Sequence, residues 1–373
     1  MIETSNSVLN RRETWGEQIP KGRLGLLRSR GWLGRPFAWL LLALSSLALP
    51  DGLAEADPSR ETLAALRPLR KPNAPNPSIG ERYRPIQNET IVLLGGTNVV
   101  EQQFANYFEA LVTLSWPDAQ VRFRNLAWEA DTVYRQQRPL YFFDREESDQ
   151  RAGSTPDQRK RIDAGTVFVR FGKMESLDGY AKIDRFLSDY GEFLDALLEI
   201  TPRVIVVTPT PFFLSGPASG LARKRNEVLE VYTHAMRVTA VERSLRVVDL
   251  FREIPANEDL SENGVHLNNE GHRRVALAML QSLDGTLSID RLDSPEFGRL
   301  RDQIAYKNSI WLQYFRPTNW SFLYGNRQHV PSSRDHLDNE KRWFPFEIES
   351  ALTLIHREER EIRELAREWG EGK

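Results

Sequence analysis

Short runs of apolar residues recur through the middle of this 373-residue chain, and they limit what it can fold into. The runs occupy residues 90–95, 121–126, 166–171, 204–208 and 245–251. Apolar residues at helical spacing fill much of the sequence between them, most clearly at about 182–199 and 222–243. Such runs, alternating with amphipathic helices, indicate a mainly parallel sheet with helices on both faces. The sequence therefore predicts a three-layer α/β/α sandwich with five strands.

The first run ends at two glycines, and a hydroxyl follows them directly. Thr97 comes after Gly95 and Gly96 and before a segment with apolar residues at helical spacing. Those apolar residues are Val100, Phe104, Phe108, Leu111 and Val112. Because parallel sheets bind ligands beyond the carboxyl ends of their strands, we expect Thr97 at a binding edge. The hydroxyl there either acts as a nucleophile or caps the following helix, and the sequence leaves both readings open.

The composition excludes several kinds of site. The chain has no cysteine, which rules out disulfides, thiolate catalysis and cysteine-ligated metals. Its formal net charge of −2 gives no electrostatic reason to expect nucleic acid as a partner. The six histidines lack the mutual spacing of metal ligands, so we expect neither a metal nor a cofactor.

The N-terminal 87 residues are expected to lie outside the folded domain. Residues 1–56 carry basic residues, then an apolar run at 37–49, then Ala54-Glu55-Ala56, which resembles a cleavage site. We interpret them as a secretory signal peptide or an uncleaved N-terminal membrane anchor, which predicts export to the periplasm or the exterior. Residues 57–87 are rich in proline and indicate an extended linker.

Three later segments bring polar residues to the same edge of the predicted sheet. The second run leads into Arg124-Asn125-Leu126-Ala127-Trp128-Glu129-Ala130-Asp131-Thr132. The third leads into Gly172-Lys173-Met174-Glu175-Ser176, and Asn263-Gly264-Val265-His266-Leu267-Asn268 follows the fifth. Because the carboxyl ends of parallel strands meet at one edge, we expect these segments to converge near Thr97.

With these blocks in this order, the chain resembles the SGNH or GDSL hydrolases, and within them an exported bacterial branch. The resemblance runs from about residue 90 to 330 and includes a tail signature. That signature comprises Lys307-Asn308, Phe315-Arg316-Pro317, Asn319, Gly325 and Arg327. The resemblance implies an SGNH-hydrolase fold, of flavodoxin-like type, over residues 88–295. Residues 296–373 then form an aromatic-rich C-terminal extension that ends in a charged helix.

The resemblance also implies an activity and roles for particular residues. The activity is hydrolysis of an ester bond, including acetyl groups on carbohydrate. Thr97 stands in the nucleophile position and His266 in that of the general base. Asn263 stands where the wider family has an aspartate that orients the histidine, and Glu262 is a neighbouring carboxylate that is able to substitute.

The expected oxyanion hole departs from the family's pattern. Its donors in the family are the nucleophile's N–H, a second-block glycine N–H and a third-block asparagine side chain. Here Ala127 takes the second position and Met174, which cannot donate, takes the third. Losing one such donor typically lowers turnover by about 10²–10³. Lys173 and Ser176 are the candidates to replace it.

Two functions remain open at this point. The first is an exported hydrolase acting on a small-molecule or carbohydrate ester, which retention of Thr97 and His266 favours. The second is a catalytically degenerate relative that keeps the cleft as a carbohydrate- or ligand-binding module. Met174, Asn263 and Gly96 favour this second function. Nothing in the sequence specifies an oligomeric state.

Three further segments have two readings each. Residues 135–160 form a polar insertion that is expected to serve as a lid or a substrate rim. The aromatic residues of 300–345 either pack a C-terminal subdomain or stack on sugar rings. The charged helix expected at 347–369 has a narrow apolar stripe, which docks on the domain or pairs with another chain.

Overall fold

The computed structural model describes residues 83–134, 162–285, 287, 289–323, 326–330 and 334–371. The predicted signal or anchor, most of the proline-rich linker and the polar insertion lie outside these residues. None of the helices in the described part combines the length and apolar character needed to cross a membrane.

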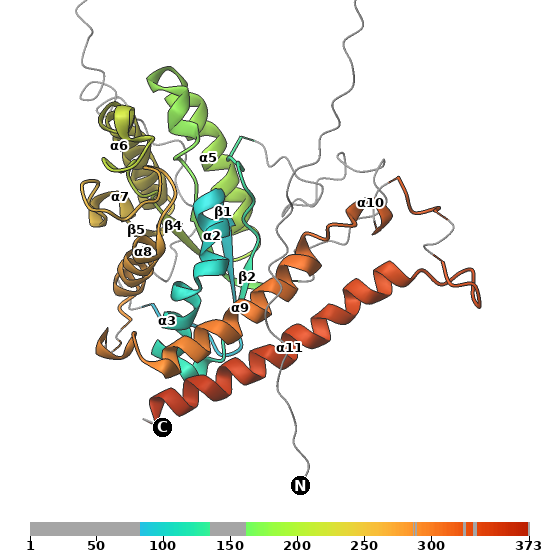
Figure 1. Cartoon of the computed structure of the whole chain (residues 1–373). Coiled ribbons are helices and arrows are strands. Elements are labelled where there is room, and N and C mark those ends of the chain that lie inside the picture. The colour runs from blue at the N-terminus through green and yellow to red at the C-terminus, as the bar shows by residue number, and fades with distance from the viewer. Residues whose placement is uncertain are drawn as a thin grey trace, which may run out of the picture. The chain divides into compact units, whose positions relative to one another are not determined.

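One parallel sheet forms the centre of the domain (Figure 1). Its strands are β1 (Thr90–Gly95), β2 (Arg122–Asn125), β3 (Ala164–Arg170), β4 (Arg203–Val207) and β5 (Arg246–Val248), in the order β2-β1-β3-β4-β5. All the described strand pairs are parallel, which confirms the predicted α/β/α sandwich. This order reverses direction between β1 and β3, and that is where doubly wound sheets bind ligands.

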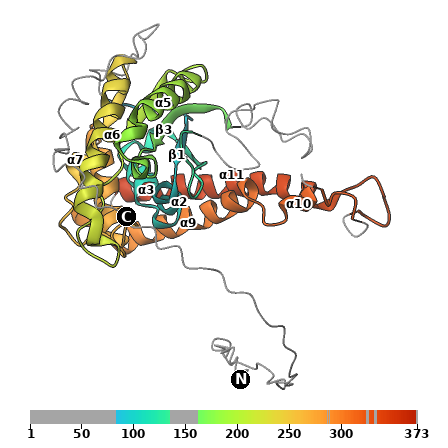
Figure 2. The ribbon, with the colours of Figure 1, turned by 90° about the horizontal axis from the view of Figure 1, so that it is seen from above.

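Helices cover both faces of this sheet (Figures 1 and 2). The helices are α2 (Thr97–Ala105), α3 (Tyr107–Ser115), α5 (Ile183–Leu198), α6 (Ala222–Glu242), α7 (Leu250–Glu253), α8 (Asn269–Ser282), α9 (Pro295–Phe315), α10 (Trp320–Leu323) and α11 (Trp343–Gly370). Ile91 and Leu93 of β1 pack with α3, α8 and α9, whereas Val92 and Leu94 pack with α5 and α6. Alternate residues of one apolar strand thus enter two cores, as a doubly covered sheet requires.

Several predicted elements differ in their bounds from those observed, and two of these differences have a structural cause. The helical pattern after Thr97 continues through residue 112, but the chain breaks it at Asn106, whose φ is 61°. Phe104 is consequently 60% exposed, although the pattern placed it on the buried face. The fifth strand ends at Val248 rather than at residue 251, because Asp249 accepts a hydrogen bond from the Thr208 hydroxyl and its carbonyl accepts the N–H groups of Arg252 and Glu253 in α7.

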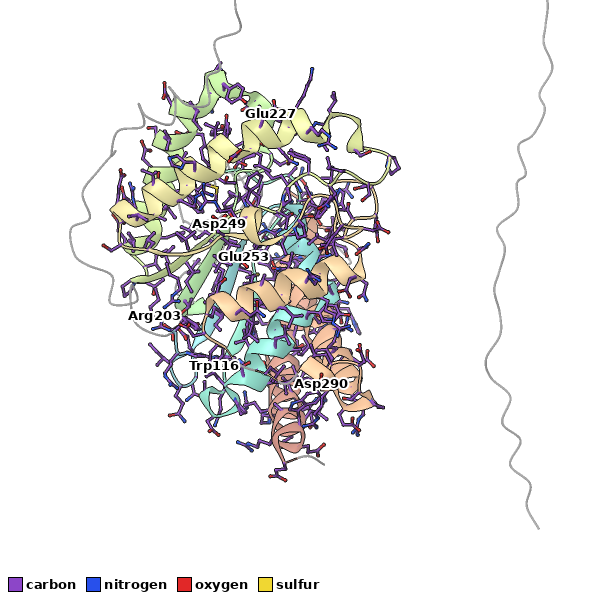
Figure 3. The ribbon with its side chains drawn as sticks, turned by 90° about the vertical axis from the view of Figure 1, so that its left-hand side faces the viewer. Trp116, Arg203, Glu227, Asp249, Glu253 and Asp290 are labelled. Atoms are coloured by element: carbon purple, nitrogen blue, oxygen red, sulfur yellow. The ribbon has the colours of Figure 1, made fainter. Side chains whose placement is uncertain are left out.

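The sheet also has a polar amino-terminal edge, remote from the expected binding edge. Arg203, at the start of β4, binds Glu89 over 3.0 Å. Figure 3 shows Arg203 away from Asp249, which follows the carboxyl end of β5. Because the Glu89 side chain is almost fully buried, this ion pair neutralises a carboxylate that would otherwise be costly to bury.

The C-terminal extension is part of the same fold. Helices α9 and α11 lie side by side (Figures 1 and 2), and each contacts the edge strand β2. Trp311 of α9 donates to the carbonyl of Asn125, and Arg124 binds Glu359 of α11 over 2.6 Å. Trp311 is itself only 3% exposed, so packing accounts for this aromatic residue. The carbonyls of Phe123 and Asn125 in this edge strand are thus engaged by side chains, which makes the strand less able to pair with another one.

Residues of the tail signature also bind α9 to the rest of the domain. The Lys307 ammonium lies 2.6 Å from a carboxylate oxygen of Glu109 on α3, and the lysine is fully buried. Asn308 donates to the carbonyl of Gln103 and to the side chain of Asn106. These side chains hold α9 against the junction of α2 and α3, where the helix breaks.

The apolar stripe of α11 provides the first test. Ile355 is fully buried in the core, whereas its neighbour Leu354 is 38% exposed. We expect Ile355→Ala to lower the free energy of unfolding by about 2–5 kcal/mol, because it removes packed methyl groups and leaves a cavity. Leu354→Ala is the control and should change it far less. Equal effects in urea denaturation would mean that α11 is not docked on the domain.

Candidate functional site

A pocket of about 200 Å³ opens at the carboxyl edge of the sheet, where β1 and β3 diverge. Thr97 and Asn98 line it from the start of α2, Arg170 and Lys173 from the end of β3, and His266 from the loop before α8. The structure therefore brings together four of the predicted site residues, Thr97, Lys173, Met174 and His266.

Gly95 determines how closely α2 approaches the sheet. A Cβ atom at this position would lie 2.6 Å from the carbonyl oxygen of Arg170 and 2.6 Å from a methyl of Val99. Only glycine avoids both clashes, so the first turn of α2 sits directly on the end of β3. The N–H groups of Val99 and Val100 donate to the carbonyl of Gly96, whereas those of Thr97 and Asn98 have no backbone partner among the described residues and carry the positive end of the helix dipole.

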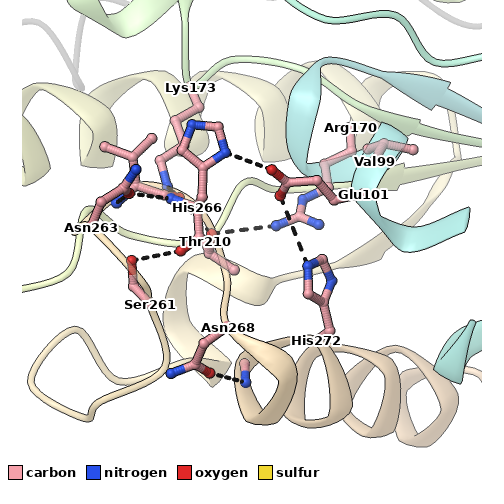
Figure 4. Close-up of polar contacts among 12 residues, drawn as sticks. Val99, Glu101, Arg170, Lys173, Thr210, Ser261, Asn263, His266, Asn268 and His272 are labelled. Atoms are coloured by element: carbon pink, nitrogen blue, oxygen red, sulfur yellow. Dashed lines mark hydrogen bonds and ion pairs between the residues drawn. The ribbon is translucent and has the colours of Figure 1, made fainter. Parts of the chain in front are cut away.

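His266 is held by a carboxylate that sequence reasoning missed. Its Nδ1 lies 2.6 Å from Oε1 of Glu101 (Figure 4). Glu101 stands four residues after Thr97, so one helix carries both groups on one face. Binding at Nδ1 leaves Nε2 as the ring nitrogen without this contact, the arrangement in which a histidine accepts a hydroxyl proton. No hydrogen bond joins the Thr97 hydroxyl to any other described residue.

Asn263 has a different place from the one expected. Its Oδ1 accepts the backbone N–H groups of Val265 and His266, both at 2.9 Å, and so shapes the loop rather than orienting the imidazole ring. The family's aspartate position is therefore used for a turn, and Glu101 supplies the carboxylate. Two features of the sequence indicate this role of Glu101: it is an acidic residue on the helix that starts at Thr97, and it stands four residues after Thr97.

Ala127 and Ser176 do not face the pocket. The N–H of Ala127 is donated to the side chain of Asn125 over 3.0 Å, and its carbonyl accepts from Arg316. The hydroxyl of Ser176 donates to the carbonyl of Lys173 and is buried below that loop. The expected second-block donor is thus already engaged, and Ser176 does not replace it. Met174 lines the pocket with a side chain that is 47% exposed.

Lys173 points into the pocket wall. Its ammonium lies 3.1 Å from the carbonyl of Pro211 and 3.4 Å from that of Val265, and it sits over the Phe212 ring. Burial and, to a smaller extent, the nearby Arg170 lower the pKa of Lys173 to about 7, while Glu101 opposes both effects. An amine with such a pKa gains or loses its proton near neutral pH.

Arg170 and His272 complete the polar floor of the site (Figure 4). Arg170 is 6% exposed, donates to Thr210 over 3.3 Å, and has a buried Nη1 without a partner. Its burial lowers its pKa to about 10. Burial, and then Arg170, lower the pKa of His272 to about 4, so this ring is neutral at pH 7 although it lies 3.8 Å from Glu101. Neither residue was predicted, but an arginine inside an apolar strand is a visible signal.

Glu175 acts within the loop rather than toward a ligand. Its carboxylate accepts the backbone N–H groups of Val133 and Gly172 at 2.9 and 2.8 Å. Burial raises the pKa of Glu175 to about 7. Within the residues that the structure describes, no three histidine, cysteine or acidic side chains converge in a way that would hold a metal ion.

The sequence pattern of the GDSL-like lipase/acylhydrolase family matches residues 77–274, which is more than half of the chain. The protein therefore belongs to this family of hydrolases, as its blocks indicated. A comparison with curated proteins finds no match.

Three solved structures are similar to this chain at low sequence identity. A putative GDSL-like lipase from Parabacteroides merdae is 12% identical, with a TM-score of 0.42 over 55% of this chain and 99% of that one. A catalytic mutant of an acetylxylan esterase from Geobacillus stearothermophilus is 16% identical, with a TM-score of 0.40 over 54% and 96%. An α/β hydrolase from the metagenome of Lake Arreo, Spain, is 17% identical, with a TM-score of 0.37 over 54% and 98%.

The pKa of Lys173 yields a test of the site's electrostatics. Between pH 7 and 10.5 the unfolded chain holds a proton on this lysine that the folded protein lacks. Lys173 therefore makes the free energy of unfolding rise with pH over that window. We expect Lys173→Met to flatten the rise seen in urea denaturation between about pH 7.5 and about pH 9.5. The exposed Lys182→Met is the control, and an unchanged slope in the Lys173 variant would contradict the assignment.

Proposed function

We propose that this protein is an ester hydrolase in which Thr97 is the nucleophile, His266 the general base and Glu101 the carboxylate that orients the histidine. The contact between Glu101 and His266, at 2.6 Å, carries the proposal. It supplies the one group that the sequence lacked at position 263, and it comes from the helix that begins at Thr97. Membership of the GDSL-like lipase/acylhydrolase family supports the reaction class.

The proposed reaction has two acyl transfers. The Thr97 oxygen attacks the ester carbonyl carbon while His266 takes the hydroxyl proton, and the alcohol leaves with that proton to give an acyl-threonine. Water then attacks the acyl group, His266 again takes a proton, and the carboxylic acid and Thr97 are released. The Glu101 carboxylate stabilises the imidazolium in both steps, and the first-turn N–H groups of α2 stabilise the oxyanion.

The size of the pocket favours a small acyl group. A volume of about 200 Å³ lies below the roughly 300–1,000 Å³ typical of pockets that enclose a drug-sized ligand. An acetyl group fits such a space, with the alcohol extending outward past Met174, whose side chain is 47% exposed. We propose acetylated carbohydrate as the substrate class on this basis and on the resemblance described above.

A binding module is the second candidate, and one set of contacts favours it. The N–H of Ala127 is engaged by Asn125, and Met174 offers no donor, so two of the family's three oxyanion donors are missing. A chain with this defect is able to bind an ester in the cleft without hydrolysing it. Turnover decides between the two candidates.

Hydrolysis of p-nitrophenyl acetate and acetylated oligosaccharides by the purified protein tests the catalytic proposal. The hydrolysis rates of Thr97→Ala and His266→Ala should fall to background. Thr97→Ser should remain active, because it keeps a nucleophilic hydroxyl. Glu101→Gln keeps the shape but loses the charge that stabilises the imidazolium, and we expect kcat to fall by about 10²–10⁴.

Glu262→Gln is the matched control for Glu101, because this acid stands in the histidine loop and has no contact with the imidazole ring among the described residues. It should retain wild-type turnover. If Glu262→Gln lowers kcat as much as Glu101→Gln, Glu101 is not the orienting group. If the wild type and all variants share one background rate, the protein is a binding module.

We also propose that the protein is exported. The apolar run at 37–49, its basic flank and the Ala54-Glu55-Ala56 site support this. A full chain with a C-terminal epitope should fractionate outside the cytoplasm, and deletion of residues 37–49 should retain it inside. Equal distribution of the two forms would contradict export.

A further inference from the structure

Among the described residues, three basic side chains line the pocket, those of Arg170, Lys173 and Arg225, against two acidic ones. Arg170 and Lys173 both line it, and Glu101 is the carboxylate that acts on the pKa values of both. Glu101 is itself bound at Oε1 by His266. The carboxylates of Asp131 and Glu175 also line the pocket, but neither contributes to the pKa of Arg170 or Lys173.

One donor in this group is buried without a partner. Arg170 is 6% exposed and uses Nη2 on Thr210, while Nη1 has no hydrogen-bond acceptor. A buried guanidinium N–H without an acceptor costs free energy, because it has lost water and gained nothing. Such a donor, on a residue that lines a pocket, is suited to an anionic ligand.

Other groups around the pocket point the same way. The first turn of the nine-residue helix α2 presents its free N–H groups there, and these favour negative charge. Lys173 lies on one side, and Arg225 of α6 also lines the pocket, over the Phe212 ring. The Lys173 ammonium donates to the carbonyls of Pro211 and Val265 and to the Thr210 hydroxyl, none of which is charged. A negatively charged ligand group in the pocket therefore lies close to basic side chains that form no ion pair with a carboxylate in the described part of the chain.

We propose that the pocket binds an anionic group through Arg170 and Lys173, and that the substrate is an ester whose alcohol part carries a carboxylate. This assignment rests on the proposed ester hydrolysis and narrows its substrate to acidic compounds, such as an acetylated uronic acid. The carboxylate lies against Arg170 and Lys173 while the acetyl carbonyl faces Thr97.

Sulfate is the probe for the anion site, because it is compact and permanently charged. Isothermal titration of the full chain, at ionic strength held constant with NaCl, should show saturable binding. Arg170→Gln and Lys173→Gln should each weaken it by about tenfold or more, because each removes a charge-assisted hydrogen bond. Arg185→Gln, on the exposed face of α5, is the matched control and should not change it.

The result that overturns the anion site is also defined. It is overturned if sulfate does not bind the wild type, or if Arg170→Gln and Arg185→Gln bind it equally. Thr97→Ala should bind sulfate like the wild type, since it removes the nucleophile and no cation. The Lys173 variant keeps the test valid if Arg170→Gln fails to fold.

The kinetic arm uses two substrates that differ in one group: monoacetylated methyl glucuronoside, with a carboxylate, and monoacetylated methyl glucoside, with a hydroxymethyl. We expect kcat/KM to favour the acid by about tenfold or more, and Arg170→Gln to abolish the preference. Equal hydrolysis of both esters overturns the acidic substrate and leaves ester hydrolysis standing. Sulfate binding that depends on Arg170, without turnover of either ester, overturns hydrolysis and assigns the site to a free anion.

Discussion

The close approach of α2 to the sheet at Gly95 is the constraint on which the whole site depends. Because a side chain at this position would strike the backbone of Arg170, glycine alone lets the helix start on the end of β3. That contact sets Thr97 at the mouth of the pocket and carries Glu101, one turn later, to His266. A chain that starts α2 farther out would keep the same residues and lose the geometry.

The C-terminal extension stabilises this arrangement from the far side. Lys307 and Asn308 fix α9 against the break between α2 and α3, and Arg316 clamps the second-block loop by binding Glu129 and stacking on Trp128. The family pattern ends at residue 274, so these supports lie outside it. They hold the loop after β2, in which the N–H of Ala127 donates to Asn125 rather than facing the pocket.

The site carries its polar groups at a cost to stability. Burial lowers the pKa values of Lys173, Arg170 and His272, which means that each charged form is destabilised where it lies. A fold has no structural need for such groups at a sheet edge, and the neighbouring Glu101 offsets only part of the lowering of the Lys173 and Arg170 pKa values. Destabilised charged groups gathered around a pocket are typical of a site that interacts with a ligand.

The sequence by itself determined the sheet, its parallel strands and the edge at which Thr97, Lys173 and His266 meet. These follow from apolar runs and strand ends, which are local properties that a single stretch of chain displays. Only the tertiary structure decided which groups pair there. Glu101 lies 165 residues from His266, and the occupation of the Ala127 N–H depends on a side-chain rotamer of Asn125. The docking of α11 likewise required the edge of β2 to be in place. Contacts between remote segments depend on the packing of the whole chain, and the hydrophobic periodicity of the sequence does not predict them.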